Sequence, residues 1–213
     1  MLQALKIFKK LPIDFGQYEM RKETKGKLIA FDLVGYGKRK RALDLGCRDG
    51  YWTKRLNDRG YAMVAADIEP HYEKAIVVDA NRHFLFPDAE FDLISSSEVI
   101  EHLDNPIFSV KEMLRVLKPS GRLILTTPNS NFWFFRLCKI FVPIEKLQTE
   151  DHKYFFSLTD IRILFPNAKI FGFFPYFILK FKISNPNLVG FLSPVFIICE
   201  EKNSDLVNKN DKY

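Results

Sequence analysis

Short, mainly apolar runs alternate with amphipathic segments through the middle of the chain. Each run ends at an acidic, polar or turn-forming residue, a pattern typical of buried strands. The segments between the runs place apolar residues three and four positions apart, which is the spacing of a helix that buries one face. The predicted elements of this region are strands 41–45, 61–66, 75–78, 91–95 and 123–126 and helices 51–57 and 106–117.

Proline and glycine mark the boundaries of several of these elements. Pro106 stands in the first turn of a predicted helix, where its missing N–H costs nothing, and Asn105 before it is a suitable N-cap. Gly60 closes the preceding predicted helix, and residues 119–121 (Pro-Ser-Gly) form a predicted turn.

After Pro128 the pattern adds a helix at residues 158–164 and two last strands at 170–174 and 195–199. Strands that alternate with helices predict a mainly parallel sheet that is buried on both faces. The predicted fold class is therefore α/β: a doubly wound, Rossmann-like, seven-stranded, mostly parallel sheet with helices on both faces.

The chain of 213 residues is expected to form one domain with additions at its ends and one insertion. A first amphipathic helix at residues 1–11 and a second at about 18–34 precede the first strand. The predicted divisions are N-terminal helices that cap the domain (1–40), the α/β domain (41–200) with an aromatic insertion (129–156), and a polar tail (201–213).

Composition narrows the class of protein. A formal net charge of +6 is modest, and without an arginine-rich run or an aromatic-basic signature we expect no nucleic-acid partner. The three cysteines are widely spaced, which argues against a disulfide framework or a zinc site and fits a reducing compartment. No stretch reaches the roughly 18–20 apolar residues of a spanning helix. A cytoplasmic protein is expected, with peripheral membrane contact through residues 1–11 as an alternative to simple packing.

The strongest chemical signal is the segment ALDLGCRDGYW at residues 42–52. An apolar strand ends at Asp44, a turn containing Gly46 and Gly50 follows, and a helix then begins. Ligands of doubly wound sheets bind outside the carboxyl ends of the strands, and glycine lets the backbone approach them closely. An ordinary strand–turn–helix junction would look similar, so this motif alone is moderate evidence.

Two further acids follow the next two strands. Asp67 comes after the second strand, where a carboxylate can accept both hydroxyls of a ribose. Asp79 comes after the third strand, where a carboxylate can accept from an exocyclic amine such as that of adenine. Either acid alone could be a helix cap or a loop carboxylate. With Asp44, the acids after strands one, two and three predict a nucleoside site.

At this point the sequence resembles class I S-adenosylmethionine (SAM)-dependent methyltransferases, and among them the methyltransferase type 11 or ubiquinone-biosynthesis-type subgroup. The glycine turn and the acids are followed by FDLISSSEVIEHLDNP (91–106), LRVLKPSGRLILTTPN (114–129) and HKYFFS (152–157). The resemblance runs from about residue 41 to 165. It implies SAM as the cofactor and S-adenosylhomocysteine as the product.

The resemblance also assigns roles to matching positions. Asp44, Gly46 and Gly50 would shape the pocket for the methionine half of SAM, Asp67 would hold the ribose, and Ser95 to Ser97 would lie beside the sulfonium. The full set of expected cofactor-binding residues is Asp44, Gly46, Cys47, Arg48, Gly50, Asp67, Ile68, Asp79, Ala80, Ser95, Ser96 and Ser97.

One position departs from the family pattern. The middle glycine of the turn is Arg48 in this chain. If that position needs a positive φ, arginine bears a modest strain, and its guanidinium could instead pair with the carboxylate of SAM. This departure sustains the alternative of a non-catalytic SAM-fold binding protein.

The segment after the serines offers a base or, less favourably, a metal pair. If it is helical, Glu98 and His102 share a face. No third ligand is evident from the sequence, so no metal site is expected. A histidine that only orders the loop is the plainer alternative to a general base. The candidate bases for deprotonating an acceptor are His102, His152 and Tyr154, in that order.

The aromatic insertion bears on the acceptor. The chain contains 21 Phe residues, most of them from Phe132 onward, and the segment NFWFFRLCKIF begins at residue 131. Phe132, Trp133, Phe135 and Phe141 could form an apolar wall rimmed by basic residues. A helix that packs its aromatics on the sheet explains the composition equally well. The basic residues of the proposed rim are Arg136, Lys139 and Lys146.

Together these features predict methyl transfer from SAM to a small or lipid-linked, partly apolar acceptor, at oxygen. A nicotinamide-dependent oxidoreductase is a weaker alternative, because Gly46 and Gly50 do not form the G-x-G-x-x-G spacing.

Overall fold

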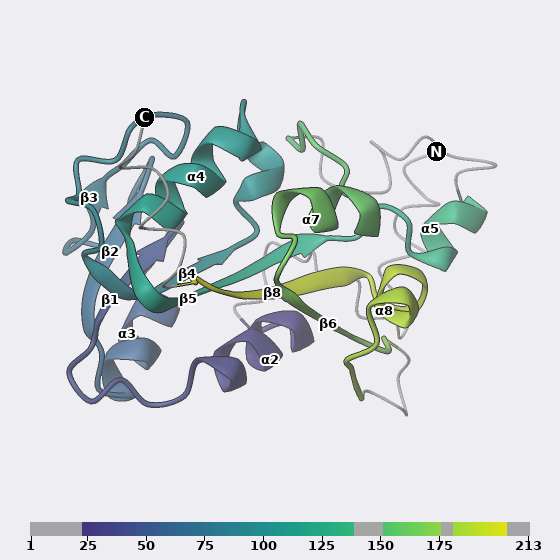
Figure 1. Cartoon of the computed structure of the whole chain (residues 1–213), viewed down its shortest axis with the longest axis horizontal. Coiled ribbons are helices and arrows are strands. Elements are labelled where there is room, and N and C mark those ends of the chain that lie inside the picture. The colour runs from purple at the N-terminus through teal and green to yellow at the C-terminus, as the bar shows by residue number, and fades with distance from the viewer. Residues whose placement is uncertain (1–22, 139–150, 176–180, 204–213) are drawn as a thin grey trace.

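The computed structural model describes residues 23–138, 151–175 and 181–203. Within them the chain forms one eight-stranded sheet flanked by helices (Figure 1). The predicted helix at residues 1–11 and the tail beyond residue 203 lie outside the described residues. The elements are α2 (Lys25–Val34), β1 (Arg41–Leu45), α3 (Tyr51–Asp58), β2 (Ala62–Asp67), β3 (Ile76–Val77), β4 (Phe91–Ser97), the 3₁₀ turn η1 (Ile100–His102), α4 (Pro106–Val116), β5 (Leu117–Pro128), α5 (Trp133–Cys138), α7 (Leu158–Leu164), β6 (Lys169–Phe173), β7 (Lys182–Ile183), α8 (Pro186–Leu192) and β8 (Val195–Glu201).

The strand order is β3-β2-β1-β4-β5-β8-β6-β7. The first five strands pair in parallel, and β8, β6 and β7 join antiparallel to their neighbours. The doubly wound α/β class is confirmed. The sheet has eight strands rather than the predicted seven, because the two-residue β7 adds an edge to β6. A strand that short carries no alternation of apolar and polar residues for a sequence pattern to detect.

Two apolar layers, one on each face of the sheet, form the core. Helices α4 and α7 cover one face, and α2 and α3 cover the other (Figure 1). Adjacent strand residues point to opposite layers: Leu43 joins the α4 side, whereas Ala42 joins the α2 side. In β5, Leu123 and Ile124 divide in the same way. This alternation buries both faces of the central strands, as continuous apolar runs require.

The predicted helix starts are confirmed by their capping bonds. The Asn105 side chain accepts from the Phe108 N–H at 3.1 Å, and Pro106 occupies the first turn of α4. Ser157 and Asp160 form a reciprocal capping box at the start of α7. These bonds satisfy N–H groups that a helix leaves unpaired at its first turn.

The turn predicted at residues 119–121 lies inside β5 rather than before it. Phe91 pairs with Leu117 and Leu93 pairs with Arg122. The residues of β5 between these two pairs outnumber those of β4, so they bulge out of the strand as a short loop. Ser120 at its tip has a φ of 60°. The chain does turn at these residues, but strand pairing resumes on both sides of the turn.

Candidate cofactor and acceptor site

The parallel strands β1, β2 and β4 end at the same edge of the sheet. Asp44 pairs with Ala65 of β2 on one side and with Ser95 of β4 on the other. Asp67 is the last residue of β2. The predicted strand-end residues therefore meet at one edge, where ligands of this sheet type bind.

The turn after β1 adopts a left-handed backbone at three positions. Gly46, Arg48 and Gly50 have φ values of 84°, 46° and 71°. A Cβ on Gly46 would stand 2.3 Å from the Val99 side chain, so only glycine fits there. The N–H groups of Gly46 and Cys47 both donate to one carbonyl of β2, at 2.8 and 3.1 Å. Arg48 thus occupies a position that does need a positive φ, and the turn keeps its shape with that residue in place.

Both carboxylate oxygens of Asp67 hold the turn and the following loop. One accepts from the Arg48 N–H at 2.7 Å, and the other accepts from the Glu69 N–H at 3.1 Å. A carboxylate offers about four acceptor sites, so each oxygen retains capacity for another donor. The side chain is 9% exposed. Its position and remaining acceptors fit a ribose diol.

Asp44 is a buried carboxyl beside this turn, and it accepts a hydrogen bond from the Thr53 hydroxyl. Burial raises the pKa of Asp44 to about 6 despite the Thr53 hydrogen bond, and the nearby charge of Asp67 adds to the rise. Two carboxylates at one edge make a negative environment, which suits a ligand that carries positive charges.

The residues expected around adenine lie on the loop after β2 and beyond β3. Asp79 already binds its own loop: one oxygen accepts from Asn81 at 2.9 Å and the other pairs with Arg82 at 3.1 Å. Ile68 is 59% exposed, so it offers an apolar face next to Asp67. Ala80 is buried, and its carbonyl accepts from a hydroxyl of α4.

The other expected cofactor residues lie deeper in the structure. Cys47 is buried, and burial raises the pKa of its thiol to about 12, so it stays a neutral thiol at physiological pH. Ser96 is almost fully buried, and its hydroxyl has no hydrogen-bond partner among the described residues. Ser95 and Ser97 alternate with it along β4 and are partly exposed.

The segment after β4 is a 3₁₀ turn, not the α-helix that would place Glu98 and His102 on one face. Glu98 has a φ of 57° and accepts from the Thr126 hydroxyl at 3.0 Å. The pairing of these two residues at helical spacing is therefore wrong. A run of four polar residues at the end of a buried strand gave no signal for the backbone reversal at Glu98.

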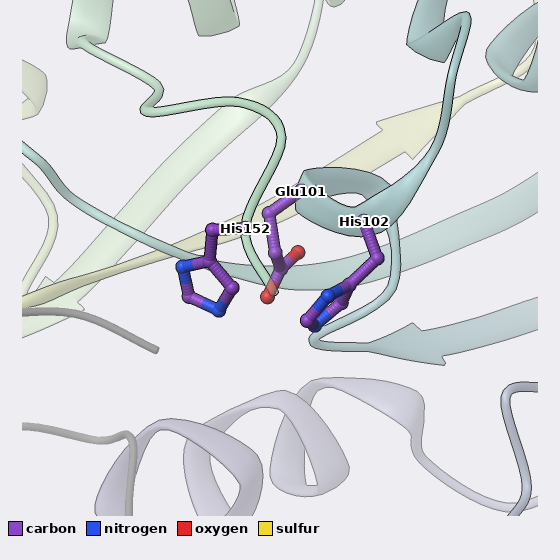
Figure 2. A group of neighbouring side chains, drawn as sticks. All are labelled: Glu101, His102 and His152. Carbon is purple, nitrogen blue, oxygen red and sulfur yellow. The ribbon is translucent and has the colours of Figure 1, made fainter. Parts of the chain in front are cut away.

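Glu101, His102 and His152 come together beyond the carboxyl ends of β4 and β5, although about fifty residues separate His152 from the other two in the chain. One ligand atom from each lies within 4.8 Å of the others, and the histidine rings lie edge to face with centroids 4.8 Å apart. Figure 2 shows the Glu101 carboxylate between the two rings. The carbonyl of Glu101 accepts from the N–H groups of Lys153 and Tyr154, which docks the HKYFFS segment against η1.

Burial sets the charge state of this cluster. It raises the pKa of Glu101 well above its ordinary value, and the neighbouring carboxyl of Glu98 raises it further. Burial and the nearby His102 lower the pKa of His152 to about 4, so His152 is a neutral imidazole near pH 7. The Lys27 ammonium on α2 acts in the opposite direction on Glu98 and Glu101.

The third candidate base is engaged elsewhere. The Tyr154 hydroxyl donates to the Asp104 carbonyl at 3.0 Å, and its ring stacks on Phe156. His102 instead faces the cluster, and its Nδ1 lies 3.2 Å from the Asp151 carbonyl. A carbonyl can only accept, so Nδ1 donates in this contact, and in the neutral form of the ring the lone pair is on Nε2.

The described part of the aromatic insertion packs on itself. Phe132 and Phe135 are buried, and Trp133 and Phe134 pack against them. Arg136 is exposed at the edge of this cluster. Of the other residues proposed for the apolar wall and its basic rim, Phe141, Lys139 and Lys146 lie outside the described residues.

Two contributors to the site were missed at the level of sequence. Lys27 lies on α2, before the first strand, and no motif connects it to the acids that its charge affects. Glu101 was placed in a motif but given no role. An acid directly before a histidine in an otherwise apolar run is a signal that could have singled it out.

Comparison with known proteins decides the family. A family model of the methyltransferase domain matches residues 18–173, well over half of the chain. The chain belongs to this methyltransferase domain family. Its cofactor is SAM.

Curated relatives cover only part of this methyltransferase. The ubiquinone biosynthesis O-methyltransferase of Azoarcus sp. (strain BH72) is 29% identical over 107 residues, which are 44% of this chain and 46% of that protein. A "probable S-adenosylmethionine-dependent methyltransferase" of Mycobacterium tuberculosis is 33% identical over 96 residues, 41% of this chain and 35% of that protein. The chain thus spans about half the length, or less, of these relatives.

Solved structures support the fold over a longer stretch. A "SAM-dependent methyltransferase, possible histamine N-methyltransferase" from Thermotoga maritima aligns with a TM-score of 0.63 over 84% of this chain and 88% of that one. At 17% identity this likeness shows the fold alone. In the part of the methyltransferase that the structure describes, no helix is long and apolar enough to cross a membrane.

The residues at the sheet edge fit SAM. Asp67 has acceptor capacity for a diol, and Gly46 keeps the turn in its left-handed conformation against the Val99 side chain. Asp44 adds negative charge where the cofactor carries a sulfonium and an ammonium group.

Proposed function

We propose that this protein transfers a methyl group from SAM to a hydroxyl oxygen of a small or lipid-linked, partly apolar acceptor. The observation that carries the proposal is the meeting, at one sheet edge, of the glycine turn, the acids Asp44 and Asp67, and the partly buried cluster of Glu101, His102 and His152. The curated O-methyltransferase that matches this chain supports oxygen as the methylated atom.

The cofactor side of the proposal rests on charge and shape. Bound SAM supplies a methyl group on a sulfonium, which is a good leaving group. Asp67 holds the ribose through acceptors that the turn has already oriented, and Asp44 places negative charge near the methionine half. Because these carboxylates are fixed by backbone and Thr53 hydrogen bonds, little reorganisation is needed when the cofactor binds.

The acceptor side rests on the histidine cluster. A hydroxyl must lose its proton as the O–C bond forms, whereas an amine needs less help, so a buried base indicates an oxygen acceptor. His152 is neutral near pH 7, and the neutral form of His102 whose Nδ1 donates to Asp151 has its lone pair on Nε2, so either ring offers a nitrogen that can accept a proton. We assign the base to these two residues rather than to Tyr154, whose hydroxyl donates to Asp104.

An apolar acceptor is supported by the surroundings of the cluster. His152 lies near Phe155, with ring centroids 6.3 Å apart, and the buried Phe132 and Phe135 follow β5 at the same edge. We therefore propose that a free amino acid is methylated more slowly than an apolar phenol. Equal turnover of the two would contradict this assignment.

The rival function is a SAM-fold protein that binds its ligand without catalysis. This alternative arises because Arg48 replaces the middle glycine of the turn. Arg48 adopts a positive φ, and its N–H still donates a hydrogen bond to the Asp67 carboxylate. This favours a functional turn over a collapsed one. A nicotinamide-dependent oxidoreductase has less support, because the turn lacks the G-x-G-x-x-G spacing.

The test is methyl transfer from methyl-labelled SAM to a panel of acceptors in three classes: phenols with apolar tails, matched anilines and free amino acids. The proposal predicts labelled methyl ethers from the phenols, with loss of turnover in His152→Ala at unchanged SAM affinity. Labelling of the anilines alone would refute oxygen transfer. Tight SAM binding with no product in any class would favour the non-catalytic rival.

A further inference from the structure

We propose that Glu101, His102 and His152 form a binding site for one divalent cation that accepts imidazole ligands, such as zinc or iron(II). We further propose that its open coordination positions take an oxygen of the acceptor, a role that rests on the proposed function. The sequence offered no third ligand for a metal pair, whereas the structure places His152 beside Glu101 and His102.

The donor set is suited to such an ion. Two imidazoles and one carboxylate are a common ligand set of catalytic zinc and of non-haem iron(II), with positions left open for substrate. Ligand atoms on one tetrahedral zinc stand about 3.3 Å apart, from metal–ligand distances of about 2.0–2.1 Å. The three donors here lie within 4.8 Å of one another, so small side-chain rotations would bring them onto one ion.

The unsatisfied oxygen of Glu101 points independently to a ligand. Glu101 is 1% exposed, and the Thr127 hydroxyl donates to its Oε2 at 3.0 Å. Its Oε1 has no hydrogen-bond partner among the described residues. A buried carboxylate oxygen without a partner is unfavourable, and a bound cation would satisfy it. In Figure 2 this carboxylate lies between the two imidazole rings.

The surroundings hold the ligands as metal sites do. His102 donates its Nδ1 proton to the Asp151 carbonyl, the outer contact that typically orients a metal-binding imidazole. The backbone bonds from Lys153 and Tyr154 to the Glu101 carbonyl fix the spacing between η1 and the HKYFFS segment.

A cation in this position would assist oxygen methylation. Coordination of an acceptor hydroxyl makes its proton easier to remove. The O–C bond then forms as the S–C bond of SAM breaks, the sulfur keeps the electron pair of that bond as a neutral thioether, and the proton leaves through water to solvent. No oxidant or further co-reactant is needed.

The experiment titrates the chelator-treated, full-length protein with Zn²⁺, Mn²⁺ and Mg²⁺ by calorimetry, and with Co²⁺ by visible absorption. We expect one equivalent of Zn²⁺ to bind, a Co²⁺ spectrum typical of nitrogen ligation, and weaker binding of Mn²⁺ and Mg²⁺. Glu101→Gln and His152→Ala should each weaken binding about tenfold or more. The matched control is His83→Ala, which removes an imidazole paired with Glu112 outside this cluster and should bind as the parent does.

Folding and cofactor binding are checked on the same samples. Glu101→Gln keeps an acceptor for Thr127, so it tests the ligand even if His152→Ala fails to fold. No binding of any of these ions, or binding that persists in Glu101→Gln, would overturn the site. SAM binding without metal binding would refute only this inference, whereas metal binding without SAM binding would refute the proposed function and leave the cation site standing.

Discussion

Replacement of Asp44 by Asn should stabilise the protein at neutral pH while it weakens cofactor binding. Burial raises the pKa of Asp44 from 3.8 to about 6, so the folded state holds a proton between these values that the unfolded chain has released. The contribution of Asp44 to the free energy of unfolding is therefore greatest below about pH 4 and is lost as the pH rises through about 6. At 1.36 kcal/mol per pKa unit the loss is about 3 kcal/mol.

The assay is urea unfolding of the parent and of Asp44→Asn between about pH 2.5 and pH 8. Asn keeps the acceptor for the Thr53 hydroxyl but does not titrate. The free energy of unfolding of the variant, relative to the parent, should rise by about 3 kcal/mol across this range and level off near pH 7. Measurement of the difference between the two proteins cancels the titration of all other groups.

The control is Asp92→Asn, for which the sign is opposite. Burial acts to raise the pKa of Asp92, but the Lys118 ammonium and the Arg41 N–H outweigh it and lower the value. The free energy of unfolding of the parent, relative to that of Asp92→Asn, should therefore increase as the pH rises through the ordinary pKa of an aspartate, 3.8. If the difference in free energy of unfolding between Asp44→Asn and the parent stays constant with pH, the argument that burial raises the pKa of Asp44 is refuted.

Three further substitutions test the turn after β1 and the ion pair on α4. Gly46→Ala should destabilise the protein by about 2 kcal/mol or more in urea unfolding, because its φ is 84° and its Cβ would overlap Val99; an unchanged midpoint would show that the turn relaxes. Arg48→Gly should change the free energy of unfolding by less than about 1 kcal/mol, since relief of strain offsets the added freedom of the unfolded chain. Its SAM affinity should stay within about fivefold of the parent, and a large gain would mean that arginine restricts the site. Glu112→Gln should cost roughly 3 kcal/mol at pH 7, because Arg115 holds the pKa of Glu112 at about 2. This difference in free energy of unfolding between Glu112→Gln and the parent should vanish as the pH falls from about 4.5 to 2. A difference that persists at about pH 2 would contradict the ion-pair account.

Local pattern could predict that the expected cofactor residues meet at one sheet edge, because these residues lie at or near strand ends. Asp44 and Asp67 each lie at the end of a strand, and parallel strands necessarily bring such residues to one edge. The positive φ of Arg48 could also be anticipated, since glycine is usual at that position of the turn. These features depend on contacts close in sequence or on the regular geometry of the sheet.

The acceptor side could not be predicted in the same way. His152 reaches Glu101 only because backbone N–H groups of the next two residues donate to the Glu101 carbonyl, about fifty positions earlier. No periodicity encodes such a contact. The reversal at Glu98 likewise arises from its N–H donating to the Thr126 carbonyl and its side chain bonding Thr126, which replaced the expected helix by a 3₁₀ turn.

The most direct measurement is calorimetric titration of the purified protein with SAM, S-adenosylhomocysteine and NAD, with Asp67→Ala and the exposed-site control Asp58→Ala. The account predicts that both adenosyl ligands bind with micromolar affinity and that NAD does not bind. Asp67→Ala should lose about tenfold or more in affinity, the worth of a charged hydrogen bond, while Asp58→Ala binds as the parent does. Absence of SAM binding in the folded protein, or equal affinity in Asp67→Ala, would contradict the assignment of this edge as the cofactor site.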